Sequence, residues 1–395
     1  MRASWLEYRV PVSAGLLVLS LGSMFVLTSQ SGSSFATYLL AIYTCLGIRR
    51  WLGLWTDWLF LSSCGLSVLI AASSFWSDTL DGRETFSQFV RAFLVITFVV
   101  AVAEGFRVDW FRAGVTRVVA LLGGGAATLA IGLFVLEPPD DGRLKGVGQL
   151  DVHVRAALVF GVSATCAVSW LMESKRTLSR VLAASLLLVL LVAVALSGSR
   201  NAWVAVPLGI AVYVGACWFE QPRALLIASA IVICVGIAIL GIALLQPELR
   251  EWLLPRGDSF RIEIWTEIIR RWWDGGRWLG LGIQTTDDVV VGQYVMPHAH
   301  NLYLALLFQV GIVGLALFFW LVGLTLKTLW REYDRNEAKL ALSILAIALP
   351  SYLLDGYRLV DKIGWSWMLF WLTLAVAVGL RSNRVLEDAQ RFGRG

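Results

Sequence analysis

Three histidines occur in the 395 residues, and two of them share one short segment. This segment, Pro297-His298-Ala299-His300-Asn301, joins a long polar stretch to a strongly apolar one, and His153 ends another polar stretch. Imidazole is the side chain best suited to exchanging protons near neutral pH. His300 is therefore the candidate general base. We expect His298 and Asn301 to contribute to substrate binding, and Asn301 could orient His300.

A metal site is the alternative interpretation of the histidines. A His-x-His pair alone is a weak signal, however, and no third ligand is fixed by its spacing. The five cysteines all lie inside apolar stretches, and no Cys-x-x-Cys pair occurs. We therefore expect no metal, no cofactor and no disulfide framework.

Arginines accumulate in the same polar stretches as the histidines. A guanidinium group stays charged near neutral pH and binds phosphate through paired donors. The arginines of these stretches therefore suit a lipid-linked phosphate or pyrophosphate, although a solvated loop surface is the simpler alternative. The stretches hold Arg143, Lys145, Arg250, Arg256, Arg261, Arg270, Arg271 and Arg277, with Arg155 just beyond.

Arg200 lies in the turn Ser197-Gly198-Ser199-Arg200, between two strongly apolar stretches. A charge at the centre of a bilayer costs at least about 2.5–3.5 kcal/mol, so such residues usually face a cavity and have a function. Snorkelling of the side chain to lipid headgroups is the alternative. We select Arg200 and Arg261 as the first candidate phosphate ligands, followed by Arg143 and Arg256.

The composition excludes an ordinary cytosolic enzyme and a disordered chain. Hydrophobic residues make up 58% of the sequence and charged residues only 15%, where a soluble protein has about 25% charged residues. The mean hydropathy is +0.72. The net charge of +5 is better explained by basic loops of a membrane protein than by nucleic-acid binding.

A helix that crosses a bilayer needs roughly 20 apolar residues, and twelve stretches qualify as candidates. They lie near 11–28, 34–48, 54–76, 88–104, 115–136, 154–172, 181–197, 201–219, 224–245, 300–324, 338–354 and 364–380. We predict an all-α, polytopic membrane bundle of about 12 helices, forming one integral membrane domain over residues 1–395. The second and eleventh stretches are short or weak, so eleven or thirteen spans remain open.

The distribution of basic residues orients this bundle, because Lys and Arg concentrate in short cytoplasmic loops. With both termini in the cytoplasm, the large loop 246–299 and the smaller loop 137–153 are periplasmic. All three histidines then lie at the periplasmic face. The basic residues assigned to the cytoplasm are Arg2, Arg9, Arg49, Arg50, Arg107, Arg112, Lys175, Arg176, Arg180, Lys327, Arg331, Arg335, Lys339, Arg381 and Arg384.

The residues after the histidines complete a longer pattern. His300-Asn301 is followed by nine residues, Gly311, two residues and Gly314; the glycines alone would indicate close helix packing. Together with the turn Ser197–Arg200 and the segments Arg261–Trp265 and Leu279–Gly282, the pattern resembles the O-antigen ligase family. The wider group includes O-antigen polymerases and O-linked oligosaccharyltransferases. The resemblance extends from about residue 140 to 320.

The resemblance implies a glycosyltransferase of the bacterial inner membrane with a periplasmic active site. The implied donor is a glycan on undecaprenyl pyrophosphate, and the acceptor is a sugar hydroxyl of lipid A–core. The family is thought to invert the anomeric centre without a nucleotide or a metal. His300 would be the base, and the arginines would stabilise the departing pyrophosphate.

Other functions use similar residues. A polymerase would extend the glycan on the same lipid-linked donor, and a protein oligosaccharyltransferase would pass it to a protein. A lipid or glycan transporter without chemistry would need polar residues along several helices at mid-membrane, whereas the charges here lie mostly at the ends of the apolar stretches. The ligase is our first prediction.

Overall fold

The computed structural model describes residues 2–26, 30–47, 51, 53–106, 108–219, 223 and 260–392. The predicted stretch 224–245 and the residues Arg250 and Arg256 lie outside these ranges. The helices are α1 (Arg2–Val26), α2 (Gln30–Cys45), α3 (Trp58–Ala72), α4 (Gly82–Gly105), α5 (Asp109–Leu136), α6 (His153–Glu173), α7 (Thr177–Leu196), α8 (Arg200–Trp218), α11 (Arg261–Gly275), α12 (Leu302–Arg331), α13 (Asn336–Leu354) and α14 (Leu372–Phe392).

Short elements complete the described chain. The 3₁₀ turn η2 (Ser73–Trp76) extends α3, and the π-helical turn η3 (Trp367–Trp371) leads into α14. The strands β1 (Val289–Val291) and β2 (Tyr294–Met296) form an antiparallel hairpin. The predicted large loop therefore contains a helix and a small sheet.

The described helices fit a multi-pass membrane protein, as predicted. By length and composition, 8 of them could cross a membrane, and three shorter apolar helices occur at Pro11–Phe25, Ser34–Cys45 and Trp367–Ser382. Because residues 224–245 lie outside the described ranges, the number of 12 spans stays a prediction. The placement of the loops in the periplasm also stays a prediction.

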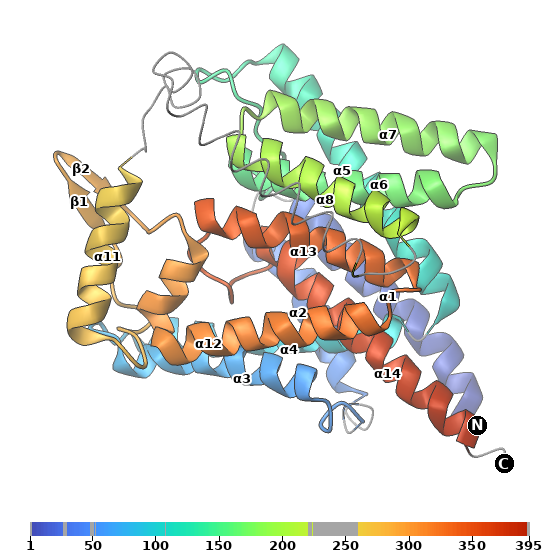
Figure 1. The fold of residues 1–395 in the computed structure, drawn as a ribbon, viewed down its shortest axis with the longest axis horizontal. Coiled ribbons are helices and arrows are strands. Elements are labelled where there is room, and N and C mark those ends of the chain that lie inside the picture. The colour runs from blue at the N-terminus through green and yellow to red at the C-terminus, as the bar shows by residue number, and fades with distance from the viewer. Residues whose placement is uncertain are drawn as a thin grey trace.

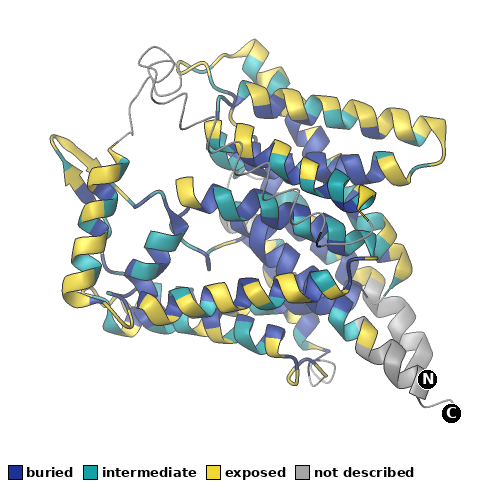
Figure 2. Ribbon diagram, in the orientation of Figure 1, coloured by how far each residue is buried: buried dark blue, intermediate teal, exposed yellow. Residues whose placement is uncertain are grey.

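Burial separates the central helices from the peripheral ones. In the apolar part of α6, 83% of the residues are buried, whereas in α7 only 22% are. Figure 2 shows α7 exposed along most of its length, and its exposed residues include Leu178, Val181 and Leu188. A helix whose outer face is apolar and exposed is what a bilayer requires. We assign α6 to the core and α7 to the lipid-facing surface.

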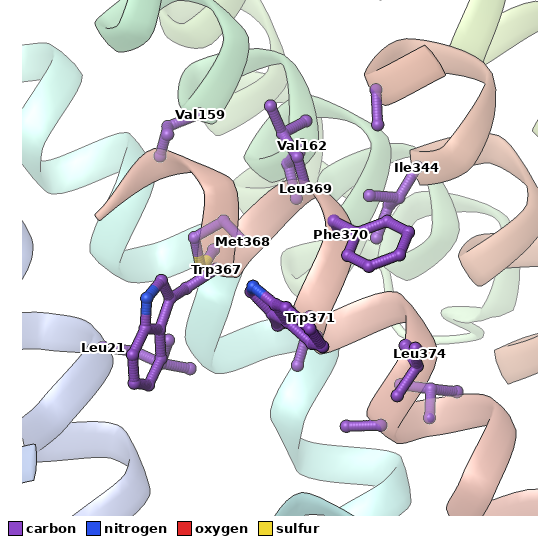
Figure 3. Close-up of a cluster of buried hydrophobic side chains, with 14 of the residues drawn as sticks. Leu21, Val159, Val162, Ile344, Trp367, Met368, Leu369, Phe370, Trp371 and Leu374 are labelled. Atoms are coloured by element: carbon purple, nitrogen blue, oxygen red, sulfur yellow. The ribbon is translucent and has the colours of Figure 1, made fainter. Parts of the chain in front are cut away.

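Aromatic residues of η3 occupy the centre of the bundle. Trp367, Phe370 and Trp371 are fully buried, and Figure 3 shows them clustered with side chains of α1, α6 and α13. The indole of Trp371 donates a hydrogen bond to the Leu359 carbonyl at 2.9 Å, so its one polar atom is satisfied. The bulky turn thus holds α14 and the segment before it against the core.

The two ends of the bundle differ. Figure 1 shows both chain termini at one end, which we call the terminal end, and α11 with the β1–β2 hairpin at the opposite end, the loop end. At the loop end, Gln284 accepts from the Asp81 amide through Oε1 and donates to Thr85 Oγ1. The Ile283 amide donates to Ser73 Oγ at 3.0 Å. The loop is therefore attached to the ends of α3 and α4.

The helix α12 is interrupted at Gly311, which has φ 64° and ψ −165°. The interruption exposes backbone groups that a continuous helix would pair internally. The segment 277–282 pairs with them instead: the amides of Leu281 and Gly282 donate to the carbonyls of Phe308 and Gln309, at 2.7 and 3.1 Å. This exchange satisfies the backbone at the break.

Residues after the break also donate hydrogen bonds back to the segment 277–282. The amides of Ile312 and Val313 donate to the carbonyls of Arg277 and Trp278, at 3.1 and 3.2 Å. A side chain at Gly311 would lie 2.2 Å from the Trp278 carbonyl oxygen. Taken alone, Gly311 would indicate packing between helices; in the structure it permits a helix break that attaches the loop to α12.

Candidate active site

The histidine segment is fixed immediately before α12. Asn301 caps the helix, because its Oδ1 accepts from the amides of Tyr303 and Leu304 at 3.0 and 3.1 Å. On the other side, the indole of Trp265 in α11 donates to the Ala299 carbonyl at 2.9 Å. Asn301 is thus 5% exposed and serves the helix terminus, so its predicted role in substrate binding stays untested.

His300 adopts an uncommon backbone conformation, with φ 48°. Positive φ costs a residue with a side chain on the order of 1–3 kcal/mol, and such residues persist mainly where the surroundings impose them. Here the surroundings are the cap of α12 and a contact from the His300 amide to His298 Nδ1 at 3.3 Å. The strained backbone determines where the His300 ring points.

The ring of His300 lies next to the buried carboxylate of Asp355. His300 Nδ1 lies 3.6 Å from Asp355 Oδ1, with the His300 side chain 39% exposed and that of Asp355 9% exposed. Asp355 follows the last residue of α13, and its Oδ1 also accepts from the Gly356 amide at 2.8 Å. One edge of the imidazole therefore faces a fixed acceptor while part of the ring remains accessible.

His298 lies on the other side of His300. The two ring centroids are 3.9 Å apart, and His298 stacks on Tyr357 with centroids 4.8 Å apart and planes at 7°. Arg155 and Arg358 both lie over the Tyr357 ring, with Cζ at 5.6 and 5.8 Å from its centroid. Tyr357 thus contacts both arginines and also His298.

The electrostatic environment keeps His298 neutral. Burial, the neighbouring His300 and the charge of Arg155 lower the pKa of His298 to about 4, although Asp355 acts in the opposite direction. Burial alone would raise the pKa of Asp355, but the contact with His300, the Gly356 amide and Arg155 together lower it. At neutral pH the cluster therefore combines a neutral His298 with an ionised Asp355.

The predicted arginines occupy different places. Arg143 donates through Nε to the Ser197 carbonyl at 3.1 Å and through Nη2 to the Gly198 carbonyl at 2.7 Å. These contacts fix the turn before α8, where Gly198 has φ 59°. They favour a structural role for Arg143, whose binding of phosphate stays untested.

Arg200 and Arg261 begin helices that contact the end of α13. Arg261, the first residue of α11, donates through Nη2 to the Leu354 carbonyl at 3.1 Å, one residue before Asp355. Arg200 is exposed and begins α8, and the next residue, Asn201, donates to the Ser351 carbonyl at 3.1 Å. The structure thus places the starts of α8 and α11 at the end of α13. The predicted Arg256 lies outside the described residues.

The segment 355–362 was not predicted to contribute to the site. It supplies Asp355, Tyr357 and Arg358, and α6 supplies Arg155. A sequence signal was present: Asp355, Arg358, Asp361 and Lys362 place four charges in a short linker between two apolar stretches. Their proximity to the histidines depends on the packing of α13 beside α12, which spacing along the chain does not reveal.

An ion network fastens this segment to α4. Arg91, 7% exposed, lies 3.2 Å from Glu84 Oε1 and 3.5 Å from Asp361 Oδ1. Arg358 lies 3.5 Å from the same Glu84 oxygen. Movement of the segment 355–362 away from α4 would separate these ion pairs and leave a buried charge unpaired, which is costly. The network therefore holds the segment in place.

Two cavities of the described chain lie away from the histidines. A polar one at the terminal end is lined by Asp109, Arg112, Glu173 and Asn336, among others, and an apolar one lies among Phe106, Val119 and Thr373. Within the described residues no group of three metal-ligating side chains gathers. The chemistry of the His300 cluster, rather than a hollow, therefore defines the candidate site.

Fold and site together define a class: a multi-pass helical membrane protein with histidines, a buried carboxylate and arginines at one end of the bundle. Residues 183–319 match the family model described as O-antigen ligase. The match includes Arg200, Arg261, His298, His300 and Asn301, and leaves out Arg143 and Asp355.

A relative leads to the same family. The chain is 29% identical over 241 residues to a protein named O-antigen ligase from Pseudomonas aeruginosa. The alignment covers 60% of this chain and 57% of the relative, so it spans little more than half of that protein. The resemblance to the O-antigen ligase family that the motifs predicted is thereby confirmed.

Proposed function

We propose that this protein transfers a glycan from undecaprenyl pyrophosphate to a sugar hydroxyl of lipid A–core, as an O-antigen ligase. The observation that carries the proposal is the contact of His300 with the buried Asp355 at 3.6 Å, next to the start of α8 and α11. His300, Arg200 and Arg261 all lie within the part of the chain that matches the O-antigen ligase model.

His300 acts as the general base in this proposal. With Nδ1 directed at Asp355, Nε2 is the atom left to accept the proton of the acceptor hydroxyl. The bond from the acceptor oxygen to the anomeric carbon forms as the bond from that carbon to the pyrophosphate oxygen breaks, and a single displacement inverts the centre. Asp355 stabilises the imidazolium that results, and general base catalysis contributes typically 10²–10⁴-fold.

The arginines carry the charge of the leaving group. Arg200 and Arg261 are our principal ligands for the pyrophosphate, with Arg256 and Arg143 behind them. Preplaced guanidinium groups stabilise negative charge that develops on the leaving oxygens. His298, which burial keeps neutral, and Asn301 complete the substrate-binding surface. The proposal requires no metal and no cofactor.

The proposal places the protein in the bacterial inner membrane. Both termini are cytoplasmic, and the loop end, including residues 246–299 and 137–153, faces the periplasm. The opposite positions of the termini and α11 support this arrangement (Figure 1). Membrane lipids surround the helices, and the polyprenyl chain of the donor occupies an apolar face of the bundle.

Deletion of the gene in its host tests the function. Loss of a ligase should leave bare lipid A–core and should accumulate long glycan on the lipid carrier. Loss of a polymerase should instead leave core capped with a single repeat unit, and that result would replace the proposal with the polymerase. Complementation with the wild-type gene should restore the lipopolysaccharide, whereas His300→Ala should not.

A further inference from the structure

Arg155 stands at the loop end, three residues into the core helix α6. Its side chain is half-buried, and its guanidinium lies over Tyr357, with Cζ 5.6 Å from the ring centroid. The buried Nε atom of Arg155 has no hydrogen-bond partner. A partly desolvated cationic group without an acceptor is energetically unfavourable, because it has lost water without replacing it.

Arg91 also has a buried Nε without a hydrogen-bond partner, but its guanidinium lies 3.2 and 3.5 Å from two carboxylates. Each of the other buried or half-buried arginines of the described residues lies near an oxygen atom, and Arg155 differs from them in this respect. The partners are Glu84 and Asp361 for Arg91, Asp109 for Arg112, Ser197 for Arg143, Leu354 for Arg261, Asp288 for Arg271, Glu332 for Arg335, Glu84 for Arg358 and Asp57 for Arg381. Within the described ranges, no hydrogen bond and no ion pair of Arg155 is found.

The surroundings of Arg155 show where an acceptor would sit. The ring of Tyr357 lies under the Arg155 guanidinium and also stacks against His298. The ring centroids of His298 and His300 are 3.9 Å apart. Asp355 is close enough to interact with Arg155 electrostatically but does not form an ion pair with it. The guanidinium therefore lies beside the histidine cluster with unused donors.

We propose that Arg155 binds a phosphate oxygen of a substrate at this cluster. This inference rests on the proposed function, which supplies two sources of phosphate: the pyrophosphate of the lipid-linked donor and the phosphates of the lipid A–core acceptor. A phosphate oxygen would accept a hydrogen bond from the accessible edge of the guanidinium and would balance its positive charge next to His298. Arg155 is thus a binding residue additional to Arg200 and Arg261.

Binding to the purified full-length protein in detergent tests this role. The probes are undecaprenyl pyrophosphate for the donor and lipid A–core for the acceptor, each titrated with wild-type protein, Arg155→Gln and Arg155→Lys. We expect Arg155→Gln to weaken one of the two by about 10–100-fold, because a charge-assisted hydrogen bond is lost. Arg155→Lys should retain part of the affinity, since it keeps the charge but loses the forked donors of the guanidinium.

Arg270→Gln is the matched control. It removes one positive charge from the same end of the molecule, but Arg270 is exposed and already paired with Glu267 and Asp274. Its affinities should stay within about twofold of wild type. The midpoint of thermal unfolding shows whether each variant is folded. If Arg155→Gln is not folded, the comparison of Arg155→Lys with wild type tests the inference.

The outcomes separate the two proposals. Selective loss for undecaprenyl pyrophosphate places Arg155 at the donor, and selective loss for lipid A–core places it at the acceptor; both support a phosphate site. If Arg155→Gln binds both probes like wild type, the inference about Arg155 is wrong while the proposed function stands. If wild-type protein binds neither probe, the proposed function itself fails.

Discussion

His298 and His300 are separated by one residue but have different surroundings. His298 is enclosed between His300 and Tyr357, and that enclosure lowers its pKa to about 4. His300 is partly accessible and faces Asp355. These surroundings are consistent with the proposal that His300 exchanges the proton, and they keep His298 neutral and packed.

The lowered pKa of His298 predicts a pH-dependent stability. The unfolded chain takes up a proton on this histidine near the ordinary pKa of 6.5, whereas the folded chain does so only near about 4. Stability is therefore lost as the pH falls through this window, by about 1–2 kcal/mol after allowance for solvent. His298→Gln should lose less stability on acidification.

Thermal unfolding of the detergent-solubilised protein measures this effect. The midpoint of wild type should fall more than that of His298→Gln between about pH 7 and pH 4.5. Asp287 titrates in the same window with the opposite sign, because burial raises its pKa to about 6. The comparison between the two proteins cancels that contribution. Equal shifts of both midpoints would contradict the assignment to His298.

At the element scale, the break in α12 connects the loop to the membrane helices. The four hydrogen bonds between the segment 277–282 and residues 308–313 exist only because Gly311 departs from the helix. The same helix begins at Asn301, immediately after His300. A change at Gly311 should therefore affect the loop and the site together.

Gly311→Ala should destabilise the protein by about 2–4 kcal/mol. The estimate combines the cost of a side chain at positive φ with the cost of overpacking, because the new Cβ would lie 2.2 Å from the Trp278 carbonyl oxygen. Glycosyl transfer should fall as well. Chemical or thermal unfolding and an assay of transfer measure the two effects.

Gly323→Ala is the control in the same helix. No atom lies within 4 Å of a Cβ at Gly323, and alanine favours a helix over glycine by about 1 kcal/mol. This variant should be as stable as wild type or slightly more stable. A loss of stability equal to that of Gly311→Ala would show that the geometry of the break is not the cause.

At the scale of the whole molecule, some features could be predicted from the sequence and others could not. Hydropathy is a local property, so the apolar helices and the loop after residue 246 could be predicted from the sequence. The motif around His300 likewise indicated that the histidines belong to the site. Asp355 and Tyr357 were missed because the packing of helices, rather than spacing along the chain, brings them to His300 and His298. The exchange of hydrogen bonds at Gly311 was missed because glycine adopts positive and negative φ about equally readily, so its presence in a sequence does not indicate a helix break.

The positions of the two ends predict the topology of the whole molecule. Asp140, in the smaller loop, and Lys175, between α6 and α7, are both exposed and lie at opposite ends of α6. A membrane-impermeant maleimide should label Asp140→Cys from the periplasm, but should label Lys175→Cys only after the inner membrane is opened. Wild-type protein is the control for native cysteines. Labelling of Lys175→Cys alone in intact inner membranes would invert the topology.

The central claim is that His300 activates an acceptor hydroxyl for glycan transfer from a lipid pyrophosphate. Purified protein, a glycan on undecaprenyl pyrophosphate and lipid A–core should yield glycosylated lipid A–core. His300→Ala should lower the rate by about 10²-fold or more while binding undecaprenyl pyrophosphate like wild type. Transfer by His300→Ala at the wild-type rate, or extension of the glycan on its carrier in place of transfer, would contradict the account.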